Sequence, residues 1–269
     1  MSENYLNRGD APFSEKVWAK IDEAAVGAAK SQLSARRVLH IEGPYGLGLK
    51  LLPGADQAVA ESEGGVKLVA STAVPLAGIH AAFALSARDV AAYDQTGLPF
   101  DLGPVARAAI ACARQEDDVV YNGSRAVGAA GLLTAKGTQS VGLASWSKIG
   151  AAADDIIKAV TKLDDAGFHG PYTLALAPAL YNLLLRRYPQ GFQSELEHIQ
   201  TIVTEGVVKA AALKDGGVLI ASGPQYATIV LGQDLAVGFV GPRDREYELT
   251  VSESLALRLI EPAAVCVLK

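Results

Sequence analysis

The last fifty residues constrain the fold most, because almost all of them fall in strand-like runs. Each run is rich in Val, Leu, Ile and Ala and is bounded by turn-forming residues, a pattern typical of β-strands. Six strands are expected, at residues 217–221, 227–231, 236–240, 246–252, 255–260 and 263–268. A strict repeat of strand, helix and parallel strand therefore does not describe this chain.

The earlier part of the chain mixes helices with a few strands. Ser14 is a good N-cap, and apolar residues from Trp18 to Leu33 recur at helical spacing, which predicts a helix from residue 14 to about residue 35. Further helices are expected at 86–97, 104–123, 147–166, 178–187 and 194–205, and strands at 38–41, 79–85 and 172–176. Helices and strands mixed without strict alternation predict the α+β class.

Residues 50–74 form a weaker pattern. Two short strands, 57–60 and 66–70, are expected on either side of a turn at 61–65. This long hairpin has too little apolar surface to form a core by itself. We therefore expect it to lie on another surface, and a partner subunit is a good candidate.

An acidic trio, Glu116, Asp117 and Asp118, lies in the last turns of the helix at 104–123. The negative end of a helix dipole favours cations there, so carboxylates need another explanation. They could form a cation site. We favour a polar network in which at least one of the three joins separate elements of the fold.

The usual catalytic and cofactor signatures do not occur in the sequence. Gly46-Leu47-Gly48 begins a dinucleotide-binding pattern but lacks its third glycine, and the four histidines have no metal-ligand spacing. Several serines could lie within reach of a histidine, as in any chain of this size, and that alone does not indicate a catalytic triad. We expect no enzymatic activity, no cofactor and no metal.

The charge and composition of the chain limit the partners that it is expected to bind and the cell compartment in which it is expected. The chain has a net charge of −5, and its N-terminal segment carries Arg8 against Glu3 and Asp10, so nucleic acid is not an expected partner. No apolar run reaches the roughly 18 residues of a membrane span, and no secretory signal is recognisable. With only two cysteines, a reduced cytoplasmic setting is expected.

Ten short motifs occur in an order and spacing that resemble the encapsulin shell-protein family. The first, APFSEKVW, leads into Ile21 and Asp22, and the acidic trio belongs to a segment, EDDVVYNG, that closes a long helix in this family. The motifs cover residues 11–18, 36–37, 42–46, 75–76, 83–85, 116–123, 131–133, 170–174, 231–238 and 253–255. The resemblance spans nearly the whole chain and implies the fold of the HK97-type phage major capsid protein.

The resemblance also implies a domain organisation and an assembly. Residues 1–49, 78–134 and 227–269 would form the P-domain with the N-terminal helix. Residues 50–77 would be the E-loop, an arm laid across a neighbouring subunit, and 135–226 the A-domain. The product would be an icosahedral shell of 60 subunits or a multiple, enclosing a cargo enzyme such as a dye-decolourising peroxidase or a ferritin-like iron oxidase.

Two sites follow from the same resemblance. A C-terminal targeting peptide of the cargo would bind at Leu33, Arg36, Val38, Ile229, Leu231 and Val237. The rim of a five-fold pore would be formed by Arg186, Arg187, Tyr188, Gln190 and Phe192. The six peptide-site residues could equally be ordinary core or interface residues, and the two arginines could be solvated residues at a helix end.

Some members of the family bind a flavin through a Trp on a short helix, but the matching position here carries Arg88. No flavin is therefore expected, even though Tyr93 could stack on a ring.

Two other classes of function stay open. One is the major capsid protein of a defective prophage, which neighbouring portal and terminase genes would favour. The other is an enzyme, which inhibitor-sensitive hydrolysis by the cargo-free protein would favour.

Overall fold

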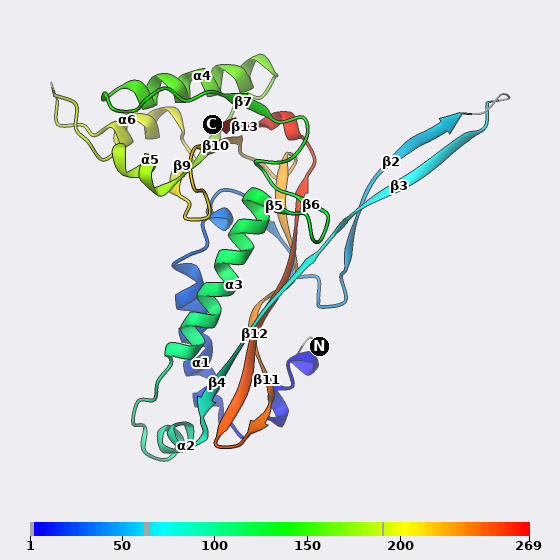
Figure 1. The fold of residues 1–269 in the computed structure, drawn as a ribbon, viewed down its shortest axis with the longest axis vertical. Helices are drawn as coiled ribbons and strands as arrows, with labels where there is room; N and C mark the ends of the chain where they lie inside the picture. Colours follow the sequence, from blue (N-terminus) through cyan, green and yellow to red (C-terminus); the bar gives the residue numbers. More distant parts are fainter. Residues whose placement is uncertain (1–2, 62–64, 190) are drawn as a thin grey trace.

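The longest helix, α3 (Gly103–Asn122), runs beside a four-stranded sheet in the computed structural model, which describes residues 3–61, 65–189 and 191–269 (Figure 1). β1 pairs in parallel with β11, and the other neighbours are antiparallel. In spatial order the strands are β1 (His40–Glu42), β11 (Ala227–Arg243), β12 (Glu246–Leu259) and β4 (Ala77–Ser86).

Two helices cover this sheet because each carries one apolar stripe. In α1 (Glu15–Lys30), Val17, Ile21, Ala25 and Ala29 are buried at intervals of four residues. In the middle of α3 the buried residues are small, namely Ala108, Ala109, Cys112 and Ala113, and they let the helix pack close to the strands. A short helix, α2 (Ala87–Thr96), begins at the Ser86 cap expected from the sequence and ends at Gly97.

A second, five-stranded sheet lies beyond the end of α3, at the top of Figure 1. Its strands, in spatial order, are β7 (Gln139–Val141), β13 (Val265–Leu268), β10 (Gly217–Ala221), β8 (Tyr172–Leu176) and β9 (Gly206–Lys209). The accompanying helices are α4 (Ala151–Asp165), α5 (Pro178–Leu183) and α6 (Glu195–Ile202). This part has its own core, built around Trp146, Ile156, Leu174 and Leu219.

The hairpin of β2 (Leu51–Glu61) and β3 (Lys67–Pro75) projects away from both sheets (Figure 1). At its base, Leu52 packs with Val230 and Ala256 of the first sheet. Farther out, the side chains of β3 from Lys67 to Ala73 are exposed. The expected arm therefore exists, with strands longer than the sequence pattern suggested. We call this hairpin the arm.

Short elements complete the chain. The 3₁₀ helices are η1 (Glu3–Leu6), η2 (Arg8–Asp10), η3 (Ala35–Arg37) and η4 (Pro262–Ala264), and β5 (Gly123–Ser124) pairs with β6 (Ala129–Ala130). No helix among the described residues is long and apolar enough to cross a membrane.

Several boundaries differ from the sequence predictions. The first helix ends at Lys30 instead of 35, because Asp117 binds the backbone N–H groups of Ser34 and Ala35 and a 3₁₀ turn follows. The strand expected at 38–41 begins only at His40 for the same reason. The helix expected at 178–187 ends at Leu183. α4 begins at Ala151 instead of 147, and α6 ends at Ile202 instead of 205. The short strands β5, β6, β7 and β9 were not expected.

The C-terminal strands differ in a more informative way. The four strands expected between 227 and 260 are two long strands, β11 and β12, whose pairing is interrupted by bulges near Gly232 and Asp234. The last strand, β13, pairs with β7 and β10. Residues 265–268 therefore belong to the second sheet, although the expected division placed all of 227–269 with the first. Long-range pairing decides this, and local pattern carries no signal for it.

Candidate functional site

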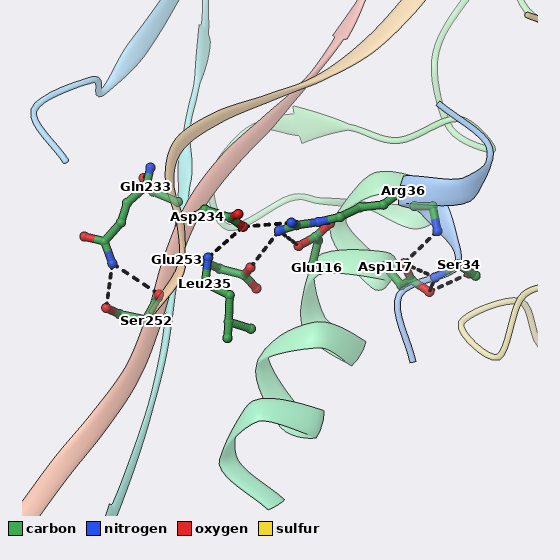
Figure 2. A network of polar contacts seen from close by, with 11 residues as sticks. Ser34, Arg36, Glu116, Asp117, Gln233, Asp234, Leu235, Ser252 and Glu253 are labelled. Atoms are coloured by element: carbon green, nitrogen blue, oxygen red, sulfur yellow. Dashed lines mark hydrogen bonds and ion pairs between the residues drawn. The ribbon is translucent and has the colours of Figure 1, made fainter. Parts of the chain in front are cut away.

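Arg36, on η3, lies where α3, β11 and β12 meet (Figure 2). Its Nε and Nη2 donate to the two carboxylate oxygens of Glu116 on α3, both at 2.7 Å. Its Nη1 donates to Asp234 on β11 at 2.7 Å, and Nη2 also lies 3.3 Å from Oε2 of Glu253 on β12. One guanidinium group therefore joins η3, α3, β11 and β12.

Asp117, the next residue of α3, holds the turn that carries Arg36 (Figure 2). Its carboxylate accepts the Ser34 N–H at 2.9 Å, the Ser34 hydroxyl at 2.5 Å and the Ala35 N–H at 2.9 Å. Asp118 accepts a hydrogen bond from Asn122 at 2.8 Å. The network interpretation of the acidic trio is therefore confirmed: two of its members connect α3 to distant segments.

A bulge in β11 directs Asp234 toward Arg36. The Gln233 N–H donates to the Ser254 hydroxyl at 2.9 Å, and the Gln233 side chain donates to the Ser252 hydroxyl at 2.9 Å. Gly232 permits this close approach, because a Cβ there would lie 2.5 Å from the Ser254 hydroxyl oxygen. We call the set Arg36, Glu116, Asp117, Asp234 and Glu253 the junction.

Burial changes the pKa values of the junction groups. Burial alone would lower the pKa of Arg36, but Glu116 and Asp234 raise it above its ordinary value, so Arg36 remains charged. Burial also raises the pKa of Asp117, against its three hydrogen bonds. For Glu253, burial and the nearby charge of Glu116 raise the pKa to about 9. The junction is a largely buried cluster of one guanidinium group and four carboxyl groups that connects four elements.

Five of the six predicted peptide-site residues are buried aliphatic residues. Leu33, Val38, Ile229, Leu231 and Val237 all belong to the main core, with at most 7% of each exposed. The structure thus brings them together, in the core of the isolated chain. The sixth, Arg36, belongs to the junction, and its side chain is 15% exposed. The alternative that some of these positions are core residues therefore has direct support.

An open pocket of about 420 Å³ is lined by residues that follow β1 and by residues at the bulge of β11. Its lining is mainly apolar and includes Leu6, Tyr45, Leu47, Gln233, Asp234 and Leu235. The Tyr45 and Leu47 side chains are 58% and 46% exposed. No role was predicted for these residues from the sequence. Tyr45, Gln233, Asp234 and Leu235 lie in the family motifs at 42–46 and 231–238, which could have indicated them; Leu6 and Leu47 lie outside both motifs.

The predicted pore-rim residues lie in the loop between α5 and α6, which extends at the upper left of Figure 1. Arg186 is not a free charge there: it donates to the carbonyl groups of Leu183, Ser147 and Trp146 and lies 3.5 Å from Glu195. The other four predicted residues differ in kind: Arg187 is exposed, Tyr188 hydrogen-bonds His198 at 2.9 Å, Phe192 is 94% exposed, and Gln190 lies outside the described residues.

The remaining candidates for chemistry are occupied by packing. Tyr93 packs on Phe100, with ring centroids 5.2 Å apart. Burial raises the pKa of Cys112 to about 12 and that of Cys266 to about 11, so both thiols stay protonated at neutral pH. In the part of the chain that the structure describes, no group of three or more His, Cys, Asp or Glu residues could hold a metal ion.

Comparison with known proteins gives consistent matches. The family described as "encapsulating protein for peroxidase" matches residues 3–256. The type 1 encapsulin shell protein EncA of Myxococcus xanthus is 30% identical over 280 residues, which cover 99% of this chain and 96% of that protein. A diheme-cytochrome–encapsulin shell fusion protein of Kuenenia stuttgartiensis is 31% identical over 96% of this chain and 74% of that protein.

Solved structures show the same fold. A virus-like particle from Pyrococcus furiosus superposes with a TM-score of 0.74 at 21% identity, covering 95% of this chain and 100% of that one. The capsid of Myoviridae phage XM1 superposes with a TM-score of 0.61 at 12% identity, covering 88% and 91%. The fold is therefore the HK97-like capsid fold. With a family match over almost its full length, this chain belongs to the encapsulin shell-protein family.

Proposed function

We propose that this chain is the structural subunit of an icosahedral shell of 60 copies, or a multiple, that encloses a cargo enzyme in the cytoplasm. In this function the chain builds the container and catalyses no reaction. Its relatives are named as shell proteins over nearly its whole length, which supports this role.

The arm is the observation that carries the proposal. Its Leu51, Leu68 and Val69 side chains are 56%, 64% and 52% exposed, although they belong to a hairpin that projects from the body (Figure 1). Exposed apolar surface of this kind is stabilised when another protein surface covers it. A neighbouring copy of the chain can supply that cover in every subunit of a closed symmetric assembly.

The particle mass tests the proposal. The chain, expressed alone, is passed over a size-exclusion column with light-scattering detection. Sixty copies of a 28.0 kDa chain give a particle of about 1.7 MDa, and larger shells give simple multiples of that mass. A monomer or small oligomer at physiological salt contradicts the proposal.

The cargo is proposed to be a dye-decolourising peroxidase or a ferritin-like iron oxidase, bound through its C-terminal peptide. The family description, which names an encapsulated peroxidase, supports the first. Leu33, Arg36, Val38, Ile229, Leu231 and Val237 remain the proposed peptide region. Since the aliphatic members are buried in the isolated chain, we propose that the peptide first contacts the adjoining pocket at Tyr45, Leu47 and Leu235.

A fluorescent protein that carries the C-terminal peptide of a co-encoded peroxidase tests this location. Leu235→Asp places a charge in the pocket and should reduce reporter co-purification with the particle at least tenfold. Leu98→Asp is the matched control, because Leu98 is an exposed leucine in the loop after α2. Equal loading of the Leu235→Asp and wild-type shells contradicts the proposed location.

At the α5–α6 loop we propose a five-fold pore rim formed by Arg186, Arg187, Tyr188, Gln190 and Phe192. Within this set, Arg187 would supply the ring of free charge, because Arg186 is held by three carbonyl groups. Five symmetric copies of one exposed charge bias the passage of ions.

The alternative function is that of a prophage capsid protein. The likeness to phage capsids at 12% identity concerns the fold alone. A genome container must neutralise phosphate, whereas this chain has a net charge of −5. Purified particles are therefore expected to contain no protected DNA after nuclease treatment, and protected genome-length DNA would favour the alternative.

A further inference from the structure

Glu253 on β12 is a buried carboxyl group that lacks a counter-charge of its own. Its side chain is fully buried, and among the described residues the one cation that forms an ion pair with it is Arg36, whose Nη2 lies 3.3 Å from Oε2. Its other oxygen, Oε1, is also buried and has no hydrogen-bond partner among the described residues. An ionised carboxylate in such a place keeps neither water nor a full set of donors.

The guanidinium group of Arg36 already pairs with the carboxyl groups of Glu116 and Asp234. Glu116 accepts two hydrogen bonds from it at 2.7 Å in a bidentate arrangement, which is the strongest geometry for such a pair. Asp234 accepts a third at 2.7 Å and is half exposed. Three carboxyl groups therefore share one guanidinium group, and Glu253 has the longest and least complete contact.

Within the described parts of the chain, the other elements around Glu253 supply no further cation. On α3, besides Glu116, the titratable neighbour is Cys112, whose thiol stays protonated. On β4, Ile79 is the residue paired with Glu253. On η3 and β11 the charged neighbours are Arg36 and Asp234. A single proton is thus the remaining means of balancing the charge of this cluster.

We propose that Glu253 carries a proton in the folded chain at neutral pH, and that this proton stabilises the contact between α3 and β12. The proton replaces a second cation, because a neutral carboxyl group can lie beside the Arg36-bound carboxyl group of Glu116 without repulsion between like charges. Removing it would place an unpaired charge inside the junction that joins four elements. The proposal concerns the fold of one chain and does not depend on whether the shell closes.

The direction of the pH dependence follows from the bound proton. Burial and the charge of Glu116 raise the pKa of Glu253 from 4.5 to about 9. Between these two values the folded chain binds one proton more than the unfolded chain, so the stabilising contribution of Glu253 is full below pH 4.5 and decreases as the pH rises. It is lost near pH 9. Across this window Glu253 alone raises the unfolding equilibrium constant by about tenfold per pH unit.

Infrared difference spectroscopy of the full-length protein, as purified, tests the proposal without unfolding it. The wild type should show a protonated-carboxyl band at pH 7 that disappears with a midpoint between pH 8 and pH 10. Glu253→Gln should lack this band. Glu246→Gln, which changes an exposed carboxylate on the same strand, should keep it.

A second variant tests the charge balance. In Glu116→Gln the bidentate partner of Arg36 is neutral, so Arg36 becomes available to Glu253. Glu253 should then ionise at neutral pH, and the band should be absent at pH 7. A wild type without the band at pH 7, or a band that persists unchanged in Glu253→Gln, overturns the proposal.

Discussion

The arm and the junction differ in which kinds of side chain they bury and which they expose to solvent. In the junction, polar groups from η3, α3, β11 and β12 contact one another within one chain, and most of them are buried (Figure 2). In the arm, apolar groups such as Leu68 and Val69 are exposed, and few contacts join the hairpin to the body beyond its base. The junction can therefore form in an isolated subunit, whereas the arm gains its stabilising contacts only from another surface.

The largest expected effect comes from charging the arm. Leu68 and Val69 are adjacent in β3 and so point to opposite faces of the hairpin. The double variant Leu68→Asp, Val69→Asp should abolish the large particle, because burying two new carboxylates against a neighbour is unfavourable. Light scattering should find small species, while circular dichroism should show an unchanged fold.

The control for this variant keeps the apolar surface. Leu68→Ile combined with Val69→Ile preserves both size class and strand preference, so the particle should form. If the doubly charged variant still assembles, the arm is not the interface, and the contrast between arm and junction fails.

Arg36→Ala should produce the next largest effect, this time on folding. Removing the cation leaves the buried Glu116 carboxylate without a partner, which costs about 3–5 kcal/mol in the free energy of unfolding. Guanidinium denaturation followed by tryptophan fluorescence measures the change. Arg37→Ala is the matched control, since Arg37 is the exposed neighbour in the same turn and should shift stability by less than about 0.5 kcal/mol.

The smallest expected effect is on a polar contact within the arm. Ser71 donates to Asp56 at 2.6 Å across the hairpin, but the contact is exposed to solvent. Ser71→Ala should therefore change the unfolding free energy by less than about 0.5 kcal/mol in the same denaturation experiment. A loss comparable to that of Arg36→Ala would mean that hydrogen bonds in the arm matter as much as those in the junction.

Much of the local structure could be predicted from the sequence. The Ser86 cap and Gly97 bound α2 as expected, and α3 ends where Gly123 follows it. The hairpin of the arm was expected because two short strand-like runs flank a turn at 61–65. The acidic trio was expected to join separate elements because carboxylates are unfavourable at the end of a helix. Each of these predictions rests on residues within a few positions of one another.

The site was less predictable, because its contacts join distant positions. Arg36 meets Glu116, Asp234 and Glu253 across 80, 198 and 217 residues. All four residues lie in family motifs, but nothing local indicates which carboxyl group takes the two strong hydrogen bonds. Leu33 and Val38 were selected as binding residues from the resemblance, and the folded chain buries both in its main core.

The sequence by itself determined the α+β class, the family, the arm and most helix ends, since capping residues, turn residues and apolar spacing act over short distances. Only the tertiary structure decided that α1 stops at Lys30, that β13 joins the second sheet and that one arginine serves three carboxyl groups. The physical reason is that backbone donors, strand edges and buried charges take the partner that packing brings to them, whatever its distance along the chain.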